Sequence, residues 1–133
     1  MKRVRSLLLA SAVLQLAGCS DVVESSHPTI TAAKEDIQRG WIPEILPDST
    51  SQIRESHNLD LNIGHGTFSF GVTNAQQFRV ALVALPVDAV IPGFKVPRVH
   101  REREGFAFYR HNDFYLAVDW SRGRGEFWRG LSR

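Results

Sequence analysis

Histidine and carboxylate side chains are the residues of this 133-residue chain that come closest to a metal-binding pattern. The five histidines are His27, His57, His65, His100 and His111. Ligands on one element normally recur at a fixed spacing, such as His at i and i+4 of a helix. The nearest grouping is His57 with Asp60 and His65, around a glycine-containing turn. Surface or capping roles fit these residues better, and we predict no metal site.

A second candidate for chemistry is the carboxylate pair Glu102 and Glu104 in the segment HREREGF. These side chains alternate with Arg101 and Arg103 at the start of an expected strand, which is typical of a solvated, mutually screened edge. The chain also lacks a Gly-x-Ser-x-Gly elbow, a His-Glu-x-x-His pair and a Walker-type loop. We therefore predict no catalytic residue, no cofactor and no enzymatic activity.

The single cysteine, Cys19, follows an apolar run that fills most of residues 7–17. Basic residues precede this run and a small residue, Gly18, follows it, which together are typical of an export signal. A bilayer-spanning helix needs about 20 apolar residues, and this run is shorter. A lone cysteine has no partner for an intrachain disulfide, so its thiol requires another explanation.

The sequence Leu16-Ala17-Gly18-Cys19 resembles the lipobox of bacterial prolipoproteins. The resemblance implies cleavage before Cys19, a diacylglyceryl thioether on its sulfur, and acylation of the new amino terminus with a chain such as palmitate. Several acyl chains hold a protein stably on a membrane, whereas one does not. The alternative is an ordinary secretory signal with Cys19 near the cleavage site by chance. We expect residues 1–18 to be a cleaved signal peptide and the membrane to be a partner through Cys19.

The residue after the cysteine bears on location within the envelope. In lipoproteins of this type, Asp at that position favours retention in the inner membrane. This chain has Ser20 there, with Asp21 one position later. The resemblance thus implies delivery to the outer membrane, with the protein facing the periplasm.

The charge balance changes when the signal peptide is removed. Three of the 16 Lys and Arg residues, Lys2, Arg3 and Arg5, lie in that segment, which leaves 13 basic against 14 acidic residues. Residues 19–94 are acidic and residues 95–133 are basic, so the two halves neutralise each other or present a charged surface to a partner. A net charge close to zero gives no support for binding nucleic acid.

Few sequence signals in the N-terminal half of the mature chain predict regular structure. Residues 19–31 are polar and read as a lipidated tether, followed by a helix from Thr31 that ends at Gly40. A short helix is expected from Ser49 to about His57, with Ile53 pointing inward.

Within this half, one segment resembles small uncharacterised envelope lipoproteins of bacteria. The motifs are Gly40-Trp41-Ile42-Pro43, Leu46-Pro47, the inward Ile53, and His57 followed by Leu59-Asp60. The resemblance implies no known activity and transfers no functional residue.

The second half shows clearer periodicity. Residues 66–72 alternate as a strand, and Phe78, Ala81, Leu82 and Leu85 form one stripe of a helix that ends before Pro86. Three strands are expected at residues 105–110, 113–120 and 125–129, separated by turn-forming residues. We therefore predict a single α+β domain over residues 32–133: a small antiparallel sheet, made of an N-terminal strand plus a C-terminal three-stranded meander, with helices covering one face.

Aromatic and arginine side chains of the meander form the candidate interface. These residues are Trp120, Arg122, Trp128 and Arg129. Trp and Arg are enriched at binding hot spots, although bulky aromatics also serve as core in small domains. The chain is thus expected to be a lipid-anchored, non-enzymatic envelope lipoprotein that binds another protein. The alternative is a small envelope hydrolase or ligand-binding protein.

Overall fold

The structure is a computed structural model that describes residues 21–91 and 97–130. The predicted signal peptide 1–18 and the lipid-attachment residue Cys19 lie outside these residues. Processing, acylation and the choice of membrane therefore stay predictions.

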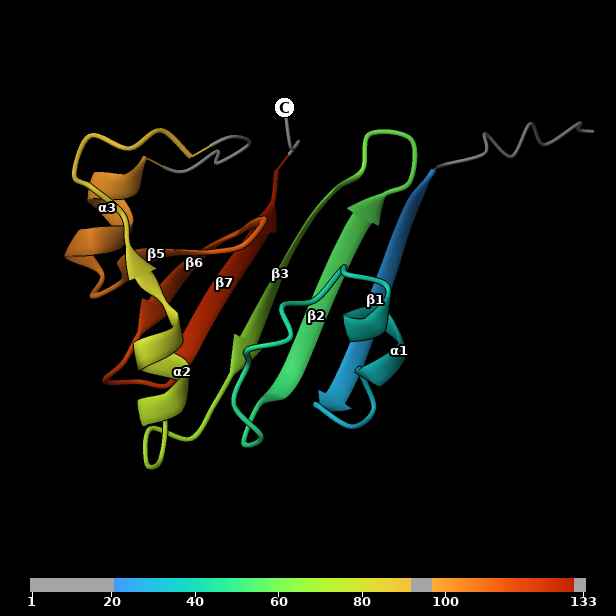
Figure 1. Ribbon diagram of the computed structural model, residues 1–133, viewed down its shortest axis with the longest axis horizontal. Coiled ribbons are helices and arrows are strands. Elements are labelled where there is room, and N and C mark those ends of the chain that lie inside the picture. The colour runs from blue at the N-terminus through green and yellow to red at the C-terminus, as the bar shows by residue number, and fades with distance from the viewer. Residues whose placement is uncertain (1–20, 92–96, 131–133) are drawn as a thin grey trace, which may run out of the picture.

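One antiparallel sheet of seven strands organises the described chain (Figure 1). Its order is β1-β2-β3-β7-β6-β5-β4, so the N-terminal strands join the C-terminal ones through the pairing of β3 with β7. The strands are β1 Val22–Thr29, β2 Ser51–Asn58, β3 Ile63–Ser69, β4 Val83–Ala84, β5 Ala107–His111, β6 Phe114–Asp119 and β7 Arg124–Arg129. Strands β1 and β4 are the two edges.

Three short helices accompany the sheet in the described residues: α1 Lys34–Gln38, α2 Gln76–Ala81 and α3 Arg98–Arg103. Ile37 of α1 and Phe78 of α2 pack into the main core. Helix α3 lies over the opposite face, because Arg98 stacks on the ring of Phe108 of β5, while Tyr109, the next residue, contacts the core. Successive strand residues point to opposite faces. We call the α1 and α2 side the covered face and the other side the open face.

The core on the covered face is built from alternating strand residues. Its buried side chains include Ile53, Phe68, Phe70, Phe78, Leu116, Val118 and Phe127. The loop between α1 and β2 adds Ile42 and Leu46, which closes the core over β2 and β3. The segment Trp41-Ile42-Pro43 is thus ordered and packs over this part of the sheet.

Two reciprocal pairs of glycine and phenylalanine fix the packing between β3 and β7. Gly66 pairs with Phe127, and Phe68 pairs with Gly125. A Cβ atom on Gly125 would lie 2.1 Å from the ring of Phe68, and one on Gly66 would lie 2.3 Å from the ring of Phe127. Each ring therefore occupies the space that a side chain would take on the opposite strand.

The predicted fold class is wrong. The protein is mainly one seven-stranded antiparallel sheet with three short helices in the described residues, rather than a small α+β sheet covered by helices. The three C-terminal strands do occur close to their expected positions. They are β5, β6 and β7 of the larger sheet, with β3 bonded to β7.

Two N-terminal segments expected to lie outside the sheet are strands. Most of the expected tether, residues 22–29, is β1, which pairs with β2 along nearly its whole length. The expected helix from Ser49 is β2, whose pairing with β3 shifts next to Gln52, a residue with a φ of 51°. Backbone pairing overrides the weak helical signal of this segment.

The predicted apolar helix to Leu85 is shorter than expected. Helix α2 ends at Ala81, and Leu82 is extended with a ψ of 137°. The chain then pairs with β5, where Val83 lies opposite Arg110 and the Leu85 amide donates to the Phe108 carbonyl at 2.9 Å. Leu82 still reaches the core, from an extended backbone.

Candidate functional site

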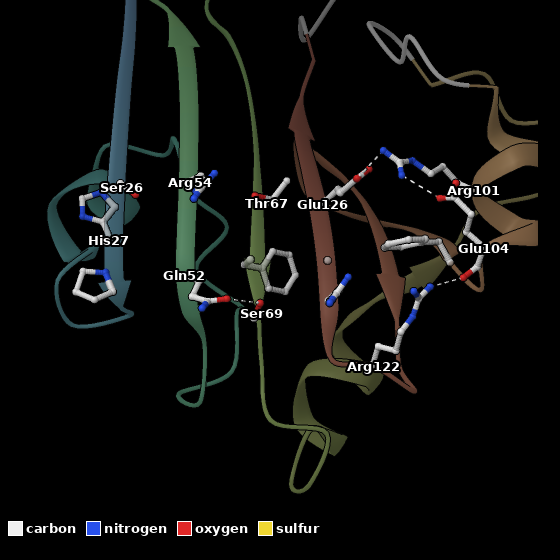
Figure 2. A pocket seen from close by; sticks show the side chains of 15 residues that line it. Ser26, His27, Gln52, Arg54, Thr67, Ser69, Arg101, Glu104, Arg122 and Glu126 are labelled. Carbon is white, nitrogen blue, oxygen red and sulfur yellow. Dashed lines mark hydrogen bonds and ion pairs between the residues drawn. The ribbon is translucent and has the colours of Figure 1, made fainter.

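The open face of the sheet carries a groove of about 1000 Å³, which we call the open-face groove (Figure 2). Its floor consists of polar side chains from four neighbouring strands, and α3 with the residues that follow it forms one wall. The floor includes the polar residues Ser26, Gln52, Arg54, Thr67, Ser69 and Arg124. Strand alternation places them there, since Arg54 pairs with Thr67 and Thr67 pairs with Glu126.

The wall of the groove is held by a branched ion pair. Arg101 of α3 contacts Glu126 of β7 at 2.8 Å and Glu104 at 3.0 Å. Burial raises the pKa of Glu126, and the charge of Arg101 acts against that rise. These contacts fix α3 against the sheet and occupy both carboxylates of the groove lining.

A buried carboxylate, Asp119, shapes the end of the groove. It accepts hydrogen bonds from the backbone amides of Ser121 and Arg122 at 3.0 and 3.1 Å, from the Ser121 hydroxyl at 2.7 Å, and from Arg122 Nε. Burial alone would raise the pKa of Asp119, but these donors outweigh burial and lower it from 3.8 to about 2. Arg122 also donates to the Glu104 carbonyl, so the β6–β7 turn is tied to the wall.

Two arginines on the floor make no polar side-chain contact with the other described residues. Arg54 and Arg124 are exposed, and neither has a side-chain hydrogen bond, ion pair or ring contact among the described residues. They lie on β2 and β7, the two neighbours of β3, opposite Thr67 and Ser69. Two strand spacings and this two-residue offset place their backbones about 12 Å apart. Hydroxyl groups of Thr67 and Ser69 lie on β3 between them. The groove thus offers two free guanidinium groups separated by neutral hydrogen-bonding side chains.

A second polar cluster lies on the covered face beneath α1. His57 Nδ1 lies 2.8 Å from Glu55 Oε1, and both side chains are buried. The imidazole stacks on Trp41 with ring centroids 3.9 Å apart. Ser25 of β1 donates to Glu55 at 3.2 Å and to Asp36 of α1 at 3.0 Å.

The geometry of this cluster suits structure rather than nucleophilic catalysis. A hydroxyl has one proton, so Ser25 can donate to one carboxylate at a time. Burial raises the pKa of Glu55, with His57 opposing the rise. Burial would also raise the pKa of Asp36, but hydrogen bonds from His27 and Ser25 hold it below its ordinary value. Ser25 donates to carboxylates and not to an imidazole, so the described residues do not form the Ser–His hydrogen bond of a catalytic triad here.

The structure does not bring the four candidate interface residues together. Trp120 packs against Phe78 on the covered face at a centroid distance of 5.3 Å, and Arg129 lies over Trp41 on the same face. Trp128 pairs with His65 and Tyr115 across the open face. Arg122 is at the end of the groove. Of the four, only Arg122 lines the open-face groove.

The weak metal grouping is likewise split by the sheet. His57 points to the covered face, and His65, one strand away, is exposed on the open face. Among the described residues, no group of three or more His, Cys, Asp or Glu side chains could hold a metal ion. Glu102 and Glu104 are exposed and contact Arg98 and Arg101, at 2.7 and 3.0 Å.

Sequence reasoning missed Arg54, Arg124 and the buried Glu55. Arg54 and Glu55 lie in the segment whose capping residues predict a helix, and a helical pattern does not separate them onto two faces of a sheet. A period-two reading of residues 51–58 would have placed Ile53, Glu55 and His57 on one face and Arg54 on the other. No local sequence signal predicts that Arg124 lies on the same sheet face as Arg54, because their shared position depends on the pairing of β3 with β7.

One comparison with known proteins bears on this fold. Residues 21–69, less than half of the chain, match the protein family described as the YbbD head domain. No curated protein and no solved structure matches the chain. The family match supports a small envelope-associated protein. It covers β1, α1, β2 and β3, and therefore the half of the groove floor that carries Arg54.

No helix within residues 21–91 and 97–130 is both long and apolar enough to span a bilayer.

Proposed function

We propose that this chain is a lipid-anchored envelope protein that binds an acidic, extended segment of a partner protein in the open-face groove. The lipid is attached to Cys19 after removal of residues 1–18, as the lipobox resemblance implies. Ser20 favours outer-membrane delivery with the domain in the periplasm. The match of residues 21–69 supports association with the envelope.

The observation that carries the binding proposal is the pair of free arginines, Arg54 and Arg124, on a hollowed and polar sheet face. Two positive charges spaced by about two strands, with hydroxyl groups between them, suit a chain with several carboxylates better than one small anion. The carboxylates of the groove lining, Glu104 and Glu126, are both held by Arg101. The groove therefore presents net free positive charge to its occupant.

A peptide-binding assay tests the proposal. Purified full-length protein in detergent is titrated into a fluorescent Glu-rich peptide and into its Gln counterpart, and anisotropy reports binding. We expect binding of the Glu peptide that weakens as salt is raised, because the contacts are solvent-exposed charge pairs. The double substitution Arg54→Glu and Arg124→Glu should abolish it.

The matched control is Arg39→Glu. Arg39 is an exposed arginine of the covered-face side, next to α1, and pairs with Glu35, so its reversal changes the net charge by as much as each single groove substitution does, without touching the groove. The control should bind the Glu peptide nearly as the unmodified protein does. Equal loss in the control and in the groove variant, or equal binding of the Gln peptide, would refute a specific groove.

Lipidation has its own test. Replacement of Cys19 by Ser should give a precursor that is not cleaved after Gly18 and takes up no fatty-acid analogue. Membrane fractionation locates the unmodified protein, and recovery in the inner membrane alone would contradict outer-membrane delivery. The hydrolase alternative in its triad form would require a serine hydrogen-bonded to an imidazole, whereas Ser25 donates to the carboxylates of Glu55 and Asp36.

A further inference from the structure

Exposed aliphatic side chains gather at one end of the sheet. The β2–β3 loop carries Leu59 and Leu61, β3 begins with Ile63, and the start of β1 carries Val22 and Val23. Their exposed fractions run from 36% to 56%. Figure 1 shows this loop at the same end of the sheet as the start of β1. We call these five residues the apolar end.

The apolar end is held outward by hydrogen bonds. The Leu61 amide donates to Asn58 Oδ1 at 2.9 Å, and the Leu59 amide donates to the Asp21 carbonyl at 3.0 Å. Asn62 adopts a left-handed conformation with a φ of 51°, which completes the turn. The two leucines are thus fixed on the surface rather than folded back onto the core. Exposed apolar residues scattered singly are ordinary, but five of them at one end of a sheet are typical of a contact surface.

The chain leads directly from this surface to the predicted lipid. Cys19 precedes Asp21 by two residues, so the connection spans at most about 7 Å. Strand β1 begins at Val22, and no long tether separates the sheet from the anchor. Resting on the proposed lipidation of Cys19, we infer that the apolar end docks into the bilayer, with Leu59 and Leu61 entering the headgroup region. The acyl chains and the loop then form one membrane contact.

The charges around the apolar end select the kind of bilayer surface. Asp21, Glu24 and Asp60 lie in or next to it, and their exposed carboxylates would be repelled by anionic headgroups. The occupant is therefore a bilayer whose headgroups are mainly zwitterionic. Docking at this end would leave the open-face groove, midway along the strands, directed sideways and accessible.

A site-specific fluorophore tests the inference. Lipidation consumes Cys19, so a cysteine introduced by Leu61→Cys is the only free thiol of the mature protein. The purified lipoprotein is labelled with a polarity-sensitive dye and reconstituted into phosphatidylcholine vesicles that contain a lipid-borne quencher. The matched control is Val80→Cys, a residue of α2 that is 71% exposed and lies away from this end.

We expect the dye at position 61 to shift to shorter wavelength and to lose most of its emission to the quencher, while the dye at position 80 does neither. Adding Leu59→Asp to the labelled variant, or replacing half of the lipid by phosphatidylglycerol, should weaken the quenching. An acylated protein with equal quenching at positions 61 and 80 would overturn the inference alone. Labelling of Cys19 itself would show that the thiol is free, and would overturn the lipid anchor together with this inference.

Discussion

The buried carboxylate of Asp119 should make a pH-dependent contribution to stability that can be isolated by one substitution. Its pKa in the folded protein is about 2, below its ordinary value of 3.8. Each pKa unit corresponds to about 1.4 kcal/mol, so the charged form contributes about 2 kcal/mol to the free energy of unfolding. Asp119→Asn keeps an oxygen that can accept from the Ser121 and Arg122 amides but removes the charge.

The sign of the effect follows from the lowered pKa. The contribution of the Asp119 charge to the free energy of unfolding is complete above the unfolded pKa of 3.8. It is lost as the pH falls toward 2. We therefore expect Asp119→Asn to be less stable than the unmodified protein by about 2 kcal/mol near pH 6, with the difference closing below about pH 3. Urea unfolding followed by tryptophan fluorescence measures both values.

Asp113→Asn is the control, because Asp113 is exposed in the β5–β6 turn. Its difference from the unmodified protein should be small at both pH values. If the Asp119→Asn difference stayed the same from about pH 6 to about pH 2.5, the loss would come from packing and not from the charge. Since Arg122 joins Asp119 to the groove wall, the same variant should also weaken binding of the Glu-rich peptide.

Further substitutions test the core and the buried pair of Glu55 and His57. Gly125→Ala should lower the free energy of unfolding by about 1–3 kcal/mol through overpacking against Phe68, and adding Phe68→Leu should cost less than the two single changes summed. Gly71→Ala, whose Cβ would lie 3.3 Å from the nearest atom, should be nearly neutral in the same denaturation assay. Glu55→Gln should change stability at neutral pH by less than about 1 kcal/mol, whereas His57→Ala should cost about 3 kcal/mol because it leaves a buried carboxylate without its partner.

The C-terminal strands could be predicted because their alternation is strong. Phe114, Leu116 and Val118 of β6 face the core at every second position, and turn-forming residues separate the strands. The same reasoning failed for β1, where Ser25 and His27 face the covered side and form hydrogen bonds rather than an apolar stripe. An edge strand with a polar inner face leaves no hydrophobic period to read.

The candidate site depends on contacts between distant parts of the chain. The polar pair Glu55 and His57 interrupts the apolar pattern of β2. The pair can be buried because the two side chains form a hydrogen bond with each other. The groove needs β7 beside β3, an arrangement that pairs residues about 60 positions apart. Local sequence patterns specify which residues alternate, but not which strands become neighbours.

The family match and the groove together show how the site is divided along the chain. Residues 21–69 supply β1, β2 and β3, and with them Arg54, Thr67 and Ser69 of the floor. Arg124 and the wall of α3 come from residues beyond the match. Because β3 is complete at Ser69 and still needs β7 to cover its other edge, the matched segment cannot form the two-arginine groove by itself. The proposed affinity for an acidic partner therefore requires the whole sheet, in which the N-terminal strands follow the proposed lipid anchor and the C-terminal strands supply Arg124.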